Sequence, residues 1–258
     1  MDSIDKLVEI VEPGSQNLIV MTGKGSKLRT VFNPPLEYNL SSVGYEMSLL
    51  RLETYFSFPN ITENKNNAIN ITINDKLYEI RIPTGCYDIE SINTVLQKQL
   101  FSKGGQKEKT EQYVILSANN NTLKCVLEIK DKKVVVDFGV DNSLRTVLGF
   151  EAKKYNNVGS YESENIVNIL NVNSILIHCD IIEGSRVNGK IAPVIYSFFP
   201  DVSPGEKIVA EPKHLIYIPL TIGIIPSMTS WVTGQTGADI DLRGEELTLT
   251  FHVRKRKH

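Results

Sequence analysis

The sequence has little net charge, few cysteines and no long apolar run. Its 258 residues carry a formal net charge of −2 with both signs mixed. This balance argues against a protein whose whole surface grips nucleic acid, because such proteins need a broad basic field. No apolar run is long enough to cross a bilayer, and the acidic N-terminus lacks the plan of a signal peptide. Cys86, Cys125 and Cys179 lie far apart, which favours free, buried thiols in a reducing compartment.

Sequence patterns for catalysis or metal binding are also missing. The run Gly23–Lys27 has the wrong spacing for a phosphate-binding loop, and no helix signal follows it. No serine sits in a Gly-x-Ser-x-Gly turn, and paired acids such as Glu162 and Glu164 are typical of solvated loops. His178 and Asp180 share one face of an expected strand, but the other histidines add no metal-ligand spacing. We therefore expect a strand histidine that is hydrogen-bonded or solvated, no enzyme activity, no cofactor and no metal site.

What the sequence does contain is strand-like periodicity. The clearest strand is the last, in which apolar residues alternate with polar ones, so that one face is buried and the other is wet. The apolar set of this strand is Leu247, Leu249, Phe251 and Val253. Further strands are expected at residues 45–58, 173–182, 191–199, 215–220 and 223–225. Several strands at this spacing, separated by proline and glycine turns, are typical of a sandwich or jelly roll.

Residues 67–153 have a different pattern. Two strands, 69–73 and 77–82, precede a helix that begins after its expected N-cap, Asp88, and ends before a Gly-Gly pair. Strands are expected again at 113–116, 123–129 and 134–138, the last two as a hairpin. Gly149 is the expected left-handed cap of one short helical turn. The pattern predicts a compact ββαββ unit in which one helix packs on one sheet.

Several sequence segments of the chain resemble those of one protein family. They are Ile82–Tyr87 (IPTGCY), Leu148–Phe150 (LGF), Asn171–Lys190, Ile195–Pro200, Tyr217–Leu220 and Ile240–Arg254 (IDLRGEELTLTFHVR). The series resembles the minor capsid (penton) proteins of Maverick/Polinton elements and the related adintoviruses. These elements are large DNA transposons of animal genomes that carry virus-like genes. The resemblance covers roughly residues 40–254, and its most specific part is the closing DLRGEE segment.

The resemblance implies a single jelly roll that assembles as a homopentamer at capsid vertices. Its implied partners are further copies of itself, a separate double-jelly-roll major capsid protein and, through the inserted unit, a host receptor. Its implied location is the virion, after synthesis in the host cytoplasm and assembly there or in the nucleus. No membrane partner is expected.

Pattern and resemblance together predict a mainly β protein, a single jelly-roll β-sandwich with an inserted small α+β (ββαββ) lobe. The expected parts are an N-terminal arm at 1–39, a discontinuous jelly roll at 40–66 and 154–254, the inserted lobe at 67–153 and a basic tail at 255–258. The basic run Arg254–His258 is read equally as a solvated end or as a contact to nucleic acid.

The closing segment supplies the candidate interface and structural residues. These are Asp239, Asp241, Arg243, Glu245 and Phe251. Phe251 is expected in the buried face of the last strand. Arg243 is expected to hold a carboxylate of Asp241, of Glu245 or of a neighbouring subunit, because arginine can bind a carboxylate through two hydrogen bonds.

Two alternatives stay open at this stage. A lectin-like β-sandwich binding module needs a concave, aromatic-rich face or clustered calcium-binding acids, and the loops show neither clearly. A hydrolase on a β scaffold needs a converging triad or a metal cluster, which only coordinates reveal.

Overall fold

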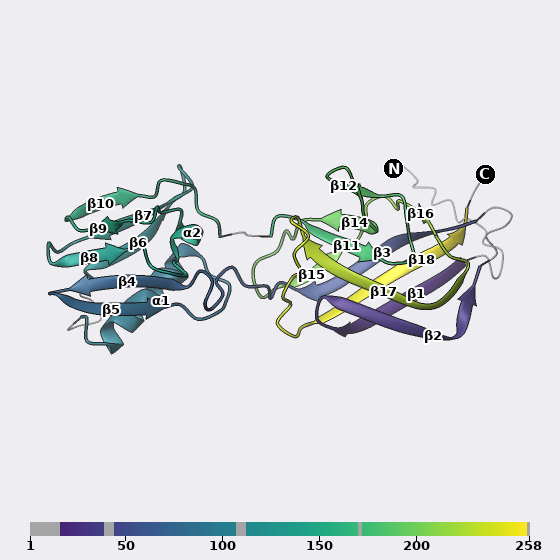
Figure 1. Ribbon diagram of the computed structural model, residues 1–258, viewed down its shortest axis with the longest axis horizontal. Helices are drawn as coiled ribbons and strands as arrows, with labels where there is room; N and C mark the ends of the chain where they lie inside the picture. Colours follow the sequence, from purple (N-terminus) through teal and green to yellow (C-terminus); the bar gives the residue numbers. More distant parts are fainter. Residues whose placement is uncertain (1–15, 39–43, 107–111, 170–171, 257–258) are drawn as a thin grey trace, which may run out of the picture. The chain divides into compact units, whose positions relative to one another are not determined.

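The computed structural model describes residues 16–38, 44–106, 112–169 and 172–256 (Figure 1). The chain is mainly β, as predicted. It divides into two compact units, one formed by residues 1–57 and 172–258 and the other by residues 58–171. We call them the jelly-roll unit and the inserted lobe. Among the described residues, no helix is long and apolar enough to span a membrane.

The described residues of the jelly-roll unit form two main antiparallel sheets. The first has the strand order β1-β18-β3-β15, and the short β16 also pairs with β3. Its strands are β1 (Gln16–Lys24), β18 (Glu246–Lys255), β3 (Tyr45–Tyr55), β15 (Lys207–Ala210) and β16 (Ile218–Pro219). The second sheet has the order β14-β11-β17-β2. Its strands are β14 (Val194–Phe198), β11 (Ile175–Cys179), β17 (Ile224–Gly234) and β2 (Lys27–Glu37). A small hairpin joins β12 (Arg186–Val187) to β13 (Lys190–Ile191).

The strand order of this unit is that of a jelly roll. The main strands run β1, β2, β3, β11, β14, β15, β17, β18 along the chain. The first pairs with the last, the second with the seventh, the third with the sixth and the fourth with the fifth. This nested antiparallel pairing places the strands in two facing sheets, which is the double Greek key of a jelly roll. The lobe is inserted between the third strand, β3, and the fourth, β11.

The last strand, β18, is central in its sheet and confirms the predicted alternation. It pairs with β1 on one side and with β3 on the other. Its apolar face is buried between the sheets: Leu247, Leu249, Phe251 and Val253 have no measurable exposure. The intervening threonines and His252 lie on the outer face and are partly exposed.

The predicted N-terminal arm is wrong over most of its length. Residues 16–37 form β1 and β2, which pair with β18 and β17 and so belong to the sandwich. The sequence hides this because the outward residues Leu18 and Val20 are apolar and exposed, so β1 shows no alternation, and because β2 contains Pro34 and Pro35. Residues 1–15 of the predicted arm lie outside the described residues, as do residues 257 and 258 of the predicted tail.

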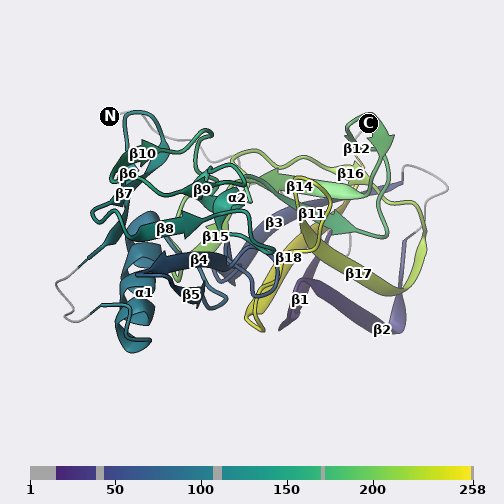
Figure 2. The same cartoon turned by 60° about the vertical axis from the view of Figure 1, so that its left-hand side comes forward.

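The described residues of the inserted lobe form two further sheets and two helices. One sheet has the order β5-β4-β8-β9 and the other β10-β7-β6. The strands are β4 (Ala68–Ile73), β5 (Lys76–Arg81), β6 (Val114–Asn119), β7 (Lys124–Ile129), β8 (Val134–Asp137), β9 (Lys154–Tyr155) and β10 (Gly159–Glu162). The helices are α1 (Ile89–Ser102) and α2 (Arg145–Leu148). Helix α1 packs beside β6 and β5 (Figure 2).

The lobe is larger than predicted. Ile61, which precedes the expected boundary at residue 67, and Tyr155, which follows the expected boundary at residue 153, both belong to its apolar core. The strands β9 and β10 pair with β8 and β7, so residues after 153 complete both lobe sheets. These strands are too short, at two and four residues, to show a period in the sequence.

Helix α1 forms where the sequence predicts it. Asp88 caps it, because Asp88 Oδ1 accepts a hydrogen bond from Ser91 N at 2.7 Å. The pKa of Asp88 is lowered first by a hydrogen bond from the Ser91 side chain and then by this backbone bond. The apolar stripe of Ile89, Ile92, Leu96 and Leu100 is buried in the lobe core, and Gly104 takes a positive φ of 74° just past the helix end. The predicted ββα part of the lobe is therefore present.

The predicted hairpin over residues 123–138 is wrong. β7 pairs with β6 and β10, whereas β8 pairs with β4 and β9, so the two strands lie in different sheets. The turn after β7 carries the chain from one sheet to the other. Both strands bury apolar residues at alternate positions, so local periodicity fits a hairpin and a sheet-to-sheet crossing equally well.

Gly149 closes α2 in the left-handed conformation that was predicted, with a φ of 83°. A Cβ at this position would lie 2.2 Å from the carbonyl oxygen of Asn165. The left-handed backbone alone costs an alanine about 1–2 kcal/mol. Because of the close contact, Gly149→Ala is expected to destabilise the lobe by more than this amount. The matched control is Gly104→Ala, which has a φ of 74° but open space around the new Cβ. Equal losses of unfolding free energy in the two variants would contradict the close contact.

Candidate functional site

The closing loop, residues 235–245, connects β17 to β18 and carries most of the predicted interface residues. Asp239, Asp241, Arg243 and Glu245 are exposed on this loop, whereas Phe251 is buried in the middle of β18. The structure therefore brings the loop residues together and separates Phe251 from them. Phe251 belongs to the core, and only the loop residues are available to a partner.

The loop has a defined turn. Asp241 Oδ1 accepts a hydrogen bond from the backbone N–H of Arg243 at 2.8 Å, and Glu245 N donates to Leu242 O at 2.9 Å. Arg243 and Gly244 both have positive φ, 53° and 80°. Ile240 and Leu242 are buried and anchor the loop to the sandwich. The charged side chains are thus presented outward from a fixed backbone.

The same loop forms hydrogen bonds with three chain connections at its end of the sandwich. Ser57 Oγ, at the exit to the lobe, donates to Leu242 O at 2.7 Å. Gln235 Oε1 accepts from the backbone of Asn173 at 3.1 Å, where the chain returns from the lobe. Gly25 N, in the turn between β1 and β2, donates to Glu245 O at 3.2 Å. The closing loop therefore positions the β1–β2 turn and both connections to the lobe.

The predicted intramolecular ion pair of Arg243 does not form. Its contact to Asp241 uses the backbone N–H, and no ion pair between described residues includes the Arg243 side chain. The positive φ of Arg243 directs the chain through the turn and leaves the side chain exposed. The remaining option, an acid of a neighbouring subunit, stays a prediction.

A second polar cluster on the outer face of β18 was not predicted. Arg254 Nε lies 2.8 Å from Glu46 Oε1, and the Arg254 guanidinium lies 3.5 Å from the centre of the Tyr217 ring. Tyr217 Oη lies 2.7 Å from His252 Nδ1. Burial lowers the pKa of His252, and the Arg254 charge lowers it further. The cluster ties β18 to β3 and to the segment before β16, so Arg254 is a fixed strand residue and not part of a solvated tail.

His178 is the hydrogen-bonded strand histidine that was expected. Its Nε2 lies 2.9 Å from Thr233 Oγ1, and its ring stacks on Trp231 with centroids 4.9 Å apart. Burial lowers its pKa, and the charge of Asp239 opposes this shift. Asp180 Oδ1 accepts a hydrogen bond from the backbone N–H of Thr229 at 2.9 Å. Among the described residues, no group of three or more histidine, cysteine or acidic side chains is arranged to hold a metal ion.

The cysteines are mostly buried. Cys125 and Cys179 are buried free thiols, and burial raises the pKa of each to about 12. Cys86 is half-buried, and its sulfur donates to Phe58 O at 3.1 Å. A raised thiol pKa disfavours the thiolate, so Cys125 and Cys179 are packing residues.

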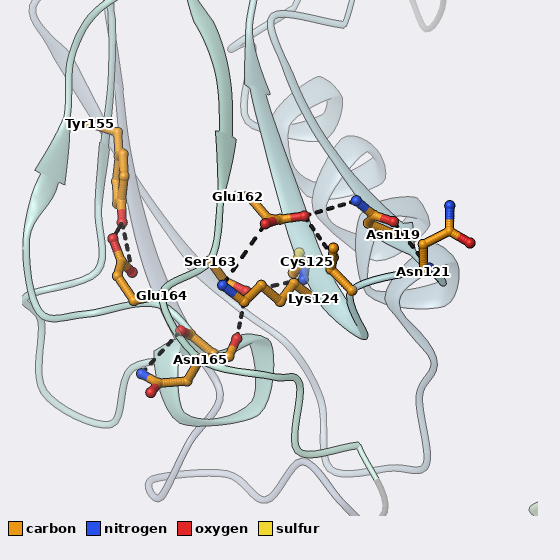
Figure 3. A network of polar contacts seen from close by, with 11 residues as sticks. Asn119, Asn121, Lys124, Cys125, Tyr155, Glu162, Ser163, Glu164 and Asn165 are labelled. Atoms are coloured by element: carbon orange, nitrogen blue, oxygen red, sulfur yellow. Dashed lines mark hydrogen bonds and ion pairs between the residues drawn. The ribbon is translucent and has the colours of Figure 1, made fainter.

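Glu162 and Glu164 belong to a polar network in the lobe (Figure 3). Glu162 Oε1 accepts from Asn119 and Thr122 at 2.8 and 2.6 Å. Glu164 accepts from Tyr155 Oη and the backbone of Glu151, both at 2.9 Å, and pairs with Lys153. Burial alone would raise the pKa of Glu164, but these donors outweigh it and lower the pKa to about 2. The two carboxylates bind separate donors, so they join strands of the lobe and do not form an acid–base pair.

Comparison with known proteins gives a likeness of structure and no match of sequence. No protein-family model and no curated protein matches the sequence. Among solved structures, the chain is similar to the mavirus penton protein, whose crystal structure was determined on selenomethionine-labelled protein. The TM-score is 0.48 at 8% sequence identity, and the match covers 93% of this chain and 99% of that chain.

Proposed function

We propose that this chain is a structural, non-enzymatic minor capsid (penton) protein of a virus-like Maverick/Polinton element, which forms the capsid vertices as a homopentamer. The observation that carries the proposal is the complete jelly-roll strand order. It occurs in a chain with several sequence segments that resemble that family. A ring of identical subunits needs two different surfaces on each copy. The sandwich offers them through its free edge strands, β1 and β2 on one side and β14 and β15 on the other.

The proposed partners follow from the two units. The jelly-roll unit would contact further copies and a double-jelly-roll major capsid protein within the virion. The lobe has its own apolar core, which supports a separate domain that can vary its surface, and a host receptor is its proposed partner. Lys255 and Arg256 are exposed at the end of β18 and remain the candidates for a nucleic-acid contact, whereas Arg254 is engaged by Glu46.

The oligomeric state tests the proposal directly. Native mass spectrometry of the full chain is expected to show a species of about five times 28.9 kDa. Negative-stain images of the same sample should show rings with five-fold symmetry. A chain that stays monomeric at every accessible concentration, with or without the major capsid protein, would contradict a vertex role.

Arg243→Ala is expected to weaken the ring more than the fold. The side chain is exposed and unpaired by any acid among the described residues, so its loss should change the free energy of unfolding by no more than about 0.5 kcal/mol. If the guanidinium holds an acid of the next subunit, the concentration needed for ring formation should rise about tenfold or more. Thermal melting and native mass spectrometry of the same sample separate the two effects.

The matched control for Arg243 is Arg81→Ala, an exposed arginine on lobe strand β5. It should leave both melting temperature and oligomer size unchanged. If Arg243→Ala behaves like Arg81→Ala, Arg243 is a solvated loop charge and makes no contact in the assembly.

A further inference from the structure

The four edge strands of the jelly-roll unit are not equally protected against pairing with another chain. Natural edge strands are blunted by charges, prolines, bulges or short length. β2 contains Pro34 and Pro35 and a register shift, β14 is five residues long, and β15 is four residues long and begins with Lys207. β1 is nine residues long, and it has no proline and no charged residue between Asn17 and Gly23. Of the described strands it pairs with β18 alone, so the backbone N–H and C=O groups of its other edge can pair with a strand of another chain.

Exposed apolar side chains accompany the edges on both sides of the sandwich. We define the first flank by Leu18 and Val20 of β1 and Val31 of β2, which are 63%, 53% and 69% exposed. We define the second flank by Val209 of β15 and Phe199 just after β14, which are 50% and 69% exposed. Figure 1 shows β2 and β14 at opposite margins of this unit. Large apolar side chains grouped at two opposed margins are typical of contact surfaces.

The charges of the two flanks are complementary. Lys27 and Arg29 are exposed at the start of β2, whereas Asp201 and Glu206 lie in the connection from β14 to β15. None of the four takes part in an ion pair between described residues.

Both charged segments lie at the lobe end of the sandwich. Gly25 N bonds to Glu245 O of the closing loop at 3.2 Å, next to the cationic segment. Gly205 N bonds to Phe56 O at 2.8 Å, next to the acidic segment and to the exit toward the lobe. A copy placed beside another in the same orientation would therefore set cations of one flank against acids of the other.

We propose that the first flank of each copy packs against the second flank of a second copy, head to tail. Strand direction supports this contact. Along the sheet β1-β18-β3-β15 every neighbouring pair is antiparallel, so β15 runs opposite to β1. The β15 strand of a copy in the same orientation would continue the alternation beyond β1. A contact between two different patches closes into a ring when the rotation fits. This inference rests on the proposed homopentamer and names its interface.

Two single lysine substitutions test the two flanks independently. Leu18→Lys places a charge in the first flank, and Val209→Lys places one in the second. Both positions are at least half exposed, so the melting temperature of each variant should stay within a few degrees of wild type. Each variant is expected to raise the concentration at which rings form about tenfold or more, because it buries an unpaired charge in every contact. Leu77→Lys, at a 53% exposed position on lobe strand β5, is the control and should assemble like wild type.

The outcomes separate this inference from the proposed function. A wild-type chain that forms no ring removes the basis of both. A wild-type pentamer that survives either lysine substitution overturns the flank contact and leaves the penton proposal standing. Dimers of Val209→Lys that are absent from Leu18→Lys would show a two-fold pairing of β1 edges and would also overturn the head-to-tail contact.

Discussion

Phe251→Ala is expected to lower the free energy of unfolding by about 3–5 kcal/mol. Phe251 is fully buried in β18, opposite Ile19 of β1 and Leu49 of β3. Removing the ring leaves a cavity where three strands of the sheet meet, and the surrounding backbone ladders allow little collapse. The loss is a large share of the about 5–15 kcal/mol that stabilises an ordinary domain. Urea or thermal denaturation of the full chain measures it.

The control for Phe251 is the adjacent residue on the opposite face. Thr250 points outward and is partly exposed, so Thr250→Ala should change the unfolding free energy by no more than about 0.5 kcal/mol. An unchanged melting temperature for Phe251→Ala would mean that the two faces of β18 are assigned the wrong way round. Comparison with Arg243→Ala adds a second contrast, since that variant should affect oligomer size and leave the melting temperature in place.

The elements that the sequence predicts well are those whose pattern is local. β18 alternates along its whole length, and α1 combines an N-cap, a buried stripe and a glycine stop. The turn between β4 and β5 lies at Asn74 and Asp75, which take the positive φ values that a tight hairpin requires. Each signal spans only a few neighbouring residues, so it survives without knowledge of the tertiary partner.

Strands buried by long-range pairing are harder to predict. In this region a strand was expected only at residues 223–225, although β17 runs from Ile224 to Gly234 between β2 and β11. Its inward set includes Ser230, which is fully buried, and its outward set includes Trp231 under His178. With small polar residues inside and an aromatic residue outside, the alternation disappears from the sequence. β1 shows no alternation for a different reason, because its exposed residues Leu18 and Val20 are apolar.

The candidate site also combines features that local sequence predicts with features that it does not. The closing loop could be identified as a structured turn from its glycine and its mixed charges, and the structure has this turn. The pair Glu46–Arg254 could not be predicted, because it joins residues 208 positions apart through the register of β3 and β18. A one-residue change in register would move every side chain to the opposite face, and local sequence does not fix the register of distant strands.

Phe138→Ala is expected to destabilise the inserted lobe by about 3–5 kcal/mol. Phe138 directly follows β8 and is fully buried. Its ring stacks on Phe150 with centroids 4.5 Å apart and meets the edge of Tyr155 at 5.9 Å. Such aromatic contacts add about 0.5–1.5 kcal/mol to the burial itself. The substitution removes the ring through which the end of β8 contacts Phe150, just after α2, and Tyr155 of β9.

Hydrogen exchange locates the effect of Phe138→Ala. Because the lobe and the jelly-roll unit have separate cores, amides of β4, β8 and β9 should lose protection while those of β18 keep it. Leu77→Ala, at an exposed position of β5 in the same sheet, is the matched control and should leave both sets unchanged. Equal loss of protection in β18 would show that the two units unfold together. The lobe would then be an integral part of the sandwich and could not serve as a domain that varies independently of the assembly surfaces.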